Sequence, residues 1–85
     1  MSALIHKAKI TRSTGRSNEC FAVTVGGKPV AAINSQGGTV LSGGNETVEY
    51  SAVGVDNLNG WAAEEIAEDF IQMGLPKLTK WQILA

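Results

Sequence analysis

The sequence predicts an α+β domain in which an antiparallel sheet of four to five strands carries one helix on a single face, in the order β-β-β-(β)-β-α-β. Three glycine doublets, at 26–27, 37–38 and 43–44, separate short runs rich in β-branched residues, which is typical of consecutive hairpins. Further along, residues 60–73 repeat apolar side chains at the helical period. A chain of 85 residues is expected to form a single small domain over 1–85.

The first hairpin is expected to join residues 4–12 to a strand that contains Phe21. The pairing that aligns apolar residues sets Ile10 opposite Phe21 and Ala8 opposite Val23. The face turned toward the helix then carries Leu4, His6, Ala8 and Ile10. The other face is expected to be exposed to solvent and carries Lys7, Lys9, Thr11, Cys20, Ala22 and Thr24.

The second hairpin is expected to turn at residues 26–27. Its expected pairs are Val25 with Lys28, Val23 with Val30, and Phe21 with Ala32. Pro29 has no backbone donor, so the third strand is expected at a sheet edge. The glycine-rich segment 35–45 predicts a hairpin loop, with a very short strand at 39–41 as an open alternative. Residues 46–55 and 78–84 predict the last two strands.

The one helix is expected from Asn59 or Gly60 to Met73, with Asn59 as N-cap, Gly74 as the residue after the last turn, and Pro76 as the stop. Its apolar stripe comprises Ala62, Ala63, Ile66, Ala67, Phe70 and Met73. The opposite side carries the acidic helix face, which we define as Glu64, Glu65, Glu68 and Asp69.

Charges are segregated along the chain. Residues 1–28 contain five bases and one acid, whereas residues 29–76 contain seven acids and no base, although the net charge is only −1. With the helix on one face of the sheet and Lys7 and Lys9 on the other, we expect a molecule with two charged poles on opposite sides. The poles would lie farther apart than the Debye length of roughly 8 Å, so each would be solvated or would meet a partner.

The sequence contains no catalytic or cofactor motif. His6 and Cys20, each the only residue of its type, are expected on opposite faces, which disfavours a nucleophile–base pair. His6 is expected to be a packed or edge residue and Cys20 an inert one. The helix carboxylates project from one face without His or Cys, so no metal site and no cofactor are expected. These observations favour a non-enzymatic protein; the single cysteine and the lack of a long apolar run favour a cytoplasmic one without membrane association.

A protein partner is expected at the acidic helix face. It would be a basic surface of another protein, such as one that normally holds nucleic acid, and Glu46, Glu49 and Asp56 are candidates to extend the site. Trp61 either folds back on residues 57–58 or is exposed as an interface anchor, and Tyr50 has the same ambiguity.

Two other functions are open. The basic N-terminal hairpin would bind nucleic acid through Lys7, Lys9, Arg12, Arg16 and Lys28. In the second of these alternatives, the chain is a small subunit that completes the site of an oligomeric enzyme. The protein is expected to be a monomer or a dimer formed through an edge strand, either the one starting at Pro29 or the C-terminal one.

The layout also resembles a known class of proteins. The hairpin stretch Glu19–Val30 (ECFAVTVGGKPV), the helix opening Ala62–Ala67 (AAEEIA), the closing strand and the small size resemble the anti-defence proteins of phages, anti-CRISPR proteins in particular. The resemblance lies in the layout of the whole chain and in no motif. It implies stoichiometric inhibition of a host CRISPR complex by occupation of a protein surface, and it implies no residue roles.

Overall fold

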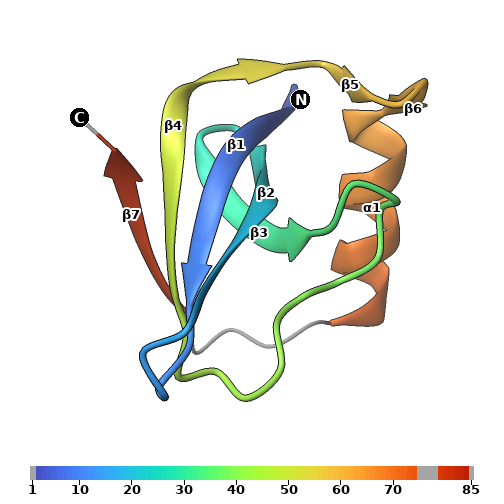
Figure 1. The fold of residues 1–85 in the computed structure, drawn as a ribbon. Helices are drawn as coiled ribbons and strands as arrows, with labels where there is room; N and C mark the ends of the chain where they lie inside the picture. The colour runs from blue at the N-terminus through green and yellow to red at the C-terminus, as the bar shows by residue number, and fades with distance from the viewer. Residues whose placement is uncertain (1, 75–78, 85) are drawn as a thin grey trace.

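The computed structural model describes residues 2–74 and 79–84, in which one helix packs against a curled sheet of five strands (Figure 1). The strands lie in the order β3-β2-β1-β4-β7. Their bounds are β1 Ala3–Thr11, β2 Ser17–Val25, β3 Lys28–Ile33, β4 Thr47–Val55 and β7 Lys80–Leu84. A hairpin of β5 (Asn57–Leu58) and β6 (Trp61–Ala62) leads into α1 (Ala63–Met73). The predicted α+β class is confirmed.

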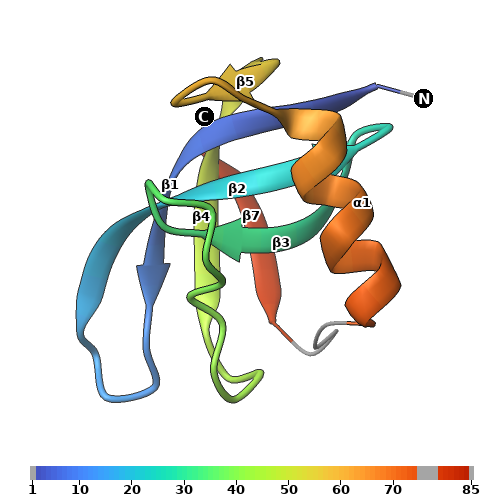
Figure 2. The ribbon, with the colours of Figure 1, turned by 90° about the vertical axis from the view of Figure 1, so that its right-hand side faces the viewer.

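The sheet is antiparallel except at its last pair, where β7 runs parallel to β4. Parallel neighbours need a long crossover connection, and here that connection contains α1. The helix packs on β1, β2 and β3, so Figures 1 and 2 show α1 and β7 on opposite sides of the molecule. The alternative strand at 39–41 is only an isolated bridge between Thr39 and Ile33.

The register of the first hairpin differs from the expected one by three residues. Lys7 lies opposite Phe21, and Ala8 lies opposite Cys20. The shift follows from a tight turn at 13–15, in which Gly15 adopts a φ of 88° and the Arg12 amide donates to the Arg16 carbonyl at 2.8 Å. Glycine at this left-handed position allows a three-residue loop, which is shorter than the one that the apolar pattern suggested.

The second hairpin follows the prediction at its turn and then departs from it. Val25 pairs with Lys28 as expected, but Val23 lies opposite Ala31 rather than Val30 because a bulge interrupts the ladder. For the same reason, Phe21 lies opposite Ile33 rather than Ala32. Pro29 precedes the irregularity, and since it cannot donate to the ladder, a bulge at this edge strand is physically reasonable.

Both faces of the sheet are buried over part of their area. The helix-side core comprises Ala3, Ile5, Val23, Ala31, Ile33, Ala63, Ile66, Ala67 and Phe70. The far-side core comprises Ala8, Ile10, Cys20, Ala22, Ala32, Leu41, Val48 and Tyr50. The curl of the sheet and the loop that carries Leu41 cover this second face, where Thr24 and His6 are also buried (Figure 1).

The expected assignment of faces is therefore wrong. Cys20, Ala22 and Thr24 are buried rather than exposed to solvent. Because side chains alternate along a strand, Lys7 and Lys9 share the face of Ile5, which is the face that carries the helix.

The helix begins later than expected. Asn59 has a φ of 54° and Gly60 a φ of 84°, so these two residues form the left-handed turn between β5 and β6 rather than the start of a helix. Trp61 consequently lies in β6, and Ala62 is the N-cap without a side-chain cap.

The helix ends as expected at Gly74, which has a φ of 63° and donates to the carbonyl of Ile71. The central part of the apolar stripe, Ala63 to Phe70, is buried, but Met73 is 61% exposed and does not belong to it. The expected stop at Pro76 and Leu78, the first residue of the expected strand at 78–84, lie outside the described residues.

Candidate protein-binding surface

The five bases of the N-terminal hairpin do not gather on one surface. Arg16 directly precedes β2 and Lys28, the first residue of β3, pairs with the last residue of β2, so the two bases lie about 30 Å apart along a nine-residue strand. Lys9 stands in register between Glu19 on β2 and Glu49 on β4. The expected basic pole on the face opposite the helix is therefore not formed.

Glu46 holds Arg12 and does not extend the acidic surface. The carboxylate is 3% exposed, and its Oε1 lies 3.1 Å from Arg12 Nη1. The same oxygen accepts hydrogen bonds from the Ser42 hydroxyl at 2.6 Å and from the amides of Ser42 and Gly43 at 2.9 Å each. Burial acts to raise the pKa of Glu46, but these hydrogen bonds outweigh it and lower the pKa to about 2. Glu46 is a structural anchor between the loop before β4 and the β1–β2 turn.

His6 and Cys20 are both buried on the far side of the sheet. His6 Nε2 lies 2.8 Å from the Thr24 hydroxyl, and its ring packs edge-on against Tyr50 at a centroid distance of 5.3 Å. The expected placement of His6 and Cys20 on opposite faces of the sheet is wrong, because Cys20 belongs to the far-side core. Burial raises the pKa of Cys20 to about 11, so its thiol is protonated near neutral pH and is a poor nucleophile.

The acidic helix face is exposed along its whole length. All four carboxylates are exposed, and none forms an ion pair with a base among residues 2–74 and 79–84. Glu64 accepts one long hydrogen bond from the Ala3 amide, at 3.3 Å. The i, i+4 spacing places Glu64 beside Glu68 and Glu65 beside Asp69, so like charges are neighbours.

Each side of the acidic helix face adjoins a different hollow. Glu64 and Glu68 border a hollow of about 340 Å³ whose wall includes Val25, Ala67 and the half-exposed Ile71. On the other side, Glu65 and Asp69 border a hollow of about 220 Å³ together with Trp61, Gln36 and Gly37. The helix thus presents carboxylates with an apolar group on each flank.

The ambiguity of the two aromatic residues is resolved. The Trp61 side chain is 42% exposed beside Glu65 and Asp69, and a Cβ built on Gly37 would lie 3.5 Å from its ring. Tyr50 is 5% exposed and packs between His6 and Trp81. The Asn59-Gly60 pair was the sequence signal for the position of Trp61, since Asn-Gly favours two-residue hairpin turns.

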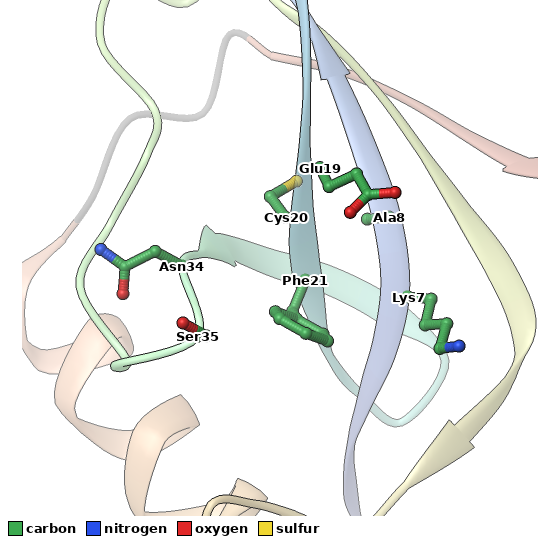
Figure 3. Close-up of a pocket in the computed structure, with 7 residues that line it drawn as sticks. All are labelled: Lys7, Ala8, Glu19, Cys20, Phe21, Asn34 and Ser35. Carbon is green, nitrogen blue, oxygen red and sulfur yellow. The ribbon is translucent and has the colours of Figure 1, made fainter.

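A larger hollow of about 470 Å³ lies on the helix-carrying face of the sheet, next to the loop after β3 (Figure 3). Figure 3 shows the Phe21 ring between Lys7 on one side and Asn34 and Ser35 on the other. Glu19 also lines it, so its charges are mixed. Cys20 is a further lining residue, but its side chain belongs to the far-side core and its thiol is protonated near neutral pH. The hollow therefore offers no accessible thiol nucleophile.

Comparison of the chain with protein-family models, with curated proteins and with solved structures finds no match. Among the described residues, no helix has the length and apolar character required to cross a membrane, and no group of three or more His, Cys, Asp or Glu is placed to hold a metal ion.

Proposed function

We propose that this chain is a non-enzymatic protein-binding module that docks on a basic surface of a partner through the acidic helix face. One observation carries the proposal. The four helix carboxylates are exposed and lack an ion pair with any described base, whereas Glu46, in the loop before β4, is bonded to Arg12, and Glu19 and Glu49 lie in register beside Lys9.

The repulsion between the helix carboxylates favours a surface that binds a cationic partner. Each like-charge pair at helical spacing costs about 0.2 to 0.5 kcal/mol in the free protein, and a cationic partner removes this repulsion. Complementary charge also speeds association and rejects wrong partners. Trp61 and Ile71, exposed on either side of the carboxylates, supply apolar anchors of the kind that dominate interface energies.

The partner that fits best is a protein surface that normally binds nucleic acid, because such surfaces carry clustered Lys and Arg side chains. The resemblance of the layout to anti-defence proteins supports host CRISPR complexes as the first candidates. In this proposal the chain acts in the cytoplasm, occupies the DNA- or RNA-binding surface of such a complex, and inhibits it stoichiometrically.

The proposal is tested by measuring target-DNA binding of purified CRISPR effector complexes with increasing amounts of the protein. Inhibition should saturate near equimolar protein and weaken with added salt. Glu64→Lys/Glu65→Lys/Glu68→Lys should abolish both inhibition and capture of the complex while the circular-dichroism spectrum is unchanged. Full inhibition by this variant would contradict the assignment of the surface.

A matched pair of variants separates the helix face from net charge. Glu64→Gln/Glu65→Gln and Glu19→Gln/Glu49→Gln each remove two negative charges, and Glu19 and Glu49 lie beside Lys9 on the sheet rather than on the helix. Only the first should weaken binding strongly, and equal losses would indicate a non-specific effect of charge. A lack of inhibition of every CRISPR complex would exclude this class of partner. The same two variants can then be compared in their capture of proteins from host lysates, which tests whether the acidic helix face binds another protein.

The geometry does not favour the other two functions. Nucleic-acid binding would need the five bases to converge, and Arg12 is bonded to Glu46 while Arg16 and Lys28 lie at opposite ends of β2. A gel shift at low salt that is lost in Lys7→Ala/Lys9→Ala would support it nevertheless. A role as an enzyme subunit gains no support from the buried His6 and Cys20.

A further inference from the structure

The two edges of the sheet are protected to different degrees. At the β3 edge, Pro29 removes a donor and a bulge follows it. The chain then folds back on this edge, since Thr39 bridges to Ile33 and the Val40 amide donates to the Ala32 carbonyl at 3.0 Å. These are devices by which natural sheets prevent pairing with another chain.

The β7 edge has no such protection among the described residues. No described strand pairs with its outer side, and Lys80–Leu84 contains neither proline nor a bulge. The Lys80 amide donates to the Glu46 carbonyl at 3.0 Å and so points toward β4. Because backbone groups of successive residues point to opposite sides of a strand, Trp81 and Ile83 present their amides and carbonyls outward.

The apolar far-side core also continues to this edge. Trp81 is half-buried against Tyr50, with ring centroids 6.3 Å apart, and Ile83 lies opposite Tyr50 in the register. Yet Ile83 is 62% exposed, since nothing among the described residues lies beyond it. The apolar face therefore ends at the open edge together with the unpaired backbone.

We propose that β7 pairs in antiparallel fashion with β7 of a second copy of the chain, with the two-fold axis at Gln82. This register sets Trp81 opposite the second copy's Ile83 on the far-side face, where an aromatic and a β-branched side chain pair favourably. Both are residues whose backbone groups point outward, so the two symmetry-related pairs would exchange backbone hydrogen bonds on both sides of the axis. The two curled sheets join into one continuous sheet.

Charge does not oppose a second copy as the occupant. Lys80 is the only charged residue of β7, and antiparallel pairing places the two Lys80 residues about 13 Å apart along the strands, beyond the Debye length of roughly 8 Å. Figure 1 shows α1 on the side of the molecule away from β7, so the two acidic helix faces of the dimer do not meet. Pairing of β7 with β3 of another copy, which would produce an open filament, is opposed by the loop on β3.

Sedimentation equilibrium over a range of protein concentrations tests the proposal. A reversible dimer is expected, and its affinity should be modest because one short strand contributes the interface. Ile83→Pro removes an outward donor, a change that an edge strand tolerates, and should weaken the dimer by at least about tenfold. Ile83→Lys should do the same by adding a charge to the edge and keeps the test valid should the proline variant fail to fold.

Hydrogen exchange resolves the register. The amides of Trp81 and Ile83 should gain protection as the protein concentration rises, whereas that of Lys80, already bonded within the monomer, should not change. Val53→Lys is the matched control, since Val53 is 81% exposed and lies outside the part of β4 that pairs with β7. A monomer at every concentration, or a dimer that both Ile83 variants leave intact, would overturn the proposal. The acidic-face variants should leave the dimer unchanged, so this result is independent of the proposed function.

Discussion

The acidic residues of β2, of β4 and of the loop before β4 differ in their surroundings from those of the helix. Glu46 is bonded to Arg12, and Glu19 and Glu49 flank Lys9, whereas the acidic helix face has no described base within ion-pair distance. A strand is surrounded by two neighbours whose residues are set by register, so opposite charges can be placed across it. The outer side of a single surface helix has no neighbouring element, so no base is placed beside its carboxylates. The acids Glu19, Glu46 and Glu49 are therefore set beside bases, by one ion pair and by strand register, whereas the four acids of the helix are not.

The largest effect expected from this comparison is on folding stability. Glu46→Ala leaves Arg12, the Ser42 hydroxyl and two loop amides without their acceptor, so it should lower the free energy of unfolding by about 2 to 3 kcal/mol. Glu65→Ala, which removes an exposed carboxylate, should change it by less than about 0.5 kcal/mol. Urea denaturation of both variants measures the difference, and similar midpoints would mean that Glu46 is not an anchor.

Acid pH should weaken the same anchor. The pKa of Glu46 is lowered from 4.5 to about 2, so the native state favours the ionised form. The resulting stability is fully present above pH 4.5 and is lost as the pH falls toward 2. The pKa of Glu46 falls by about 2.5 units, so at about 1.4 kcal/mol per unit the loss is at most roughly 3 to 4 kcal/mol. Urea midpoints measured across this range should fall for the wild type and fall less for Glu46→Gln; parallel curves would contradict the assignment.

The smallest expected effect has the opposite sign. Glu68→Lys removes the repulsion with Glu64 and creates a favourable i, i+4 pair, so it should raise the free energy of unfolding by about 0.5 kcal/mol. The thermal midpoint should rise by a few degrees at low salt, and the gain should shrink as salt is added. A decrease in stability would indicate that Glu68 has a structural partner, which would weaken the contrast between helix and strands.

The acidic helix face could be predicted because the helical period alone determines which residues share one side of the helix. Ile66 and Phe70 had to lie on one side of α1, and the four acids therefore had to lie on the other. The strand faces were not predictable in the same way, since they depend on a tight turn at Gly15 and a bulge in β3 that the apolar pattern does not encode. The Glu46 anchor was missed because Arg12, its ionic partner, lies 34 residues away in the chain.

Asn59 was misassigned for a different reason. Asparagine is favoured both as a helix N-cap and in a left-handed hairpin turn, and the glycine that follows it favours the turn. The assignment of Asn59 to a helix N-cap or to a hairpin turn determines the position of Trp61, because a helix starting at Asn59 would have included Trp61. The identity of the candidate surface was thus predicted from its carboxylates, whereas the placement of its aromatic residue required the structure.

The presence of a core on each face of the sheet affects how incorrect strand registers are avoided. In most two-layer domains a one-residue slip of a strand exposes its apolar side chains and is strongly penalised. In β2, however, Val23 belongs to the helix-side core, whereas Cys20 and Ala22 belong to the far-side core, so a slip of this strand would exchange one buried set for another. Hydrophobicity alone discriminates weakly between such alignments. The turns, above all the one at Gly15, are what make the native alignment unique.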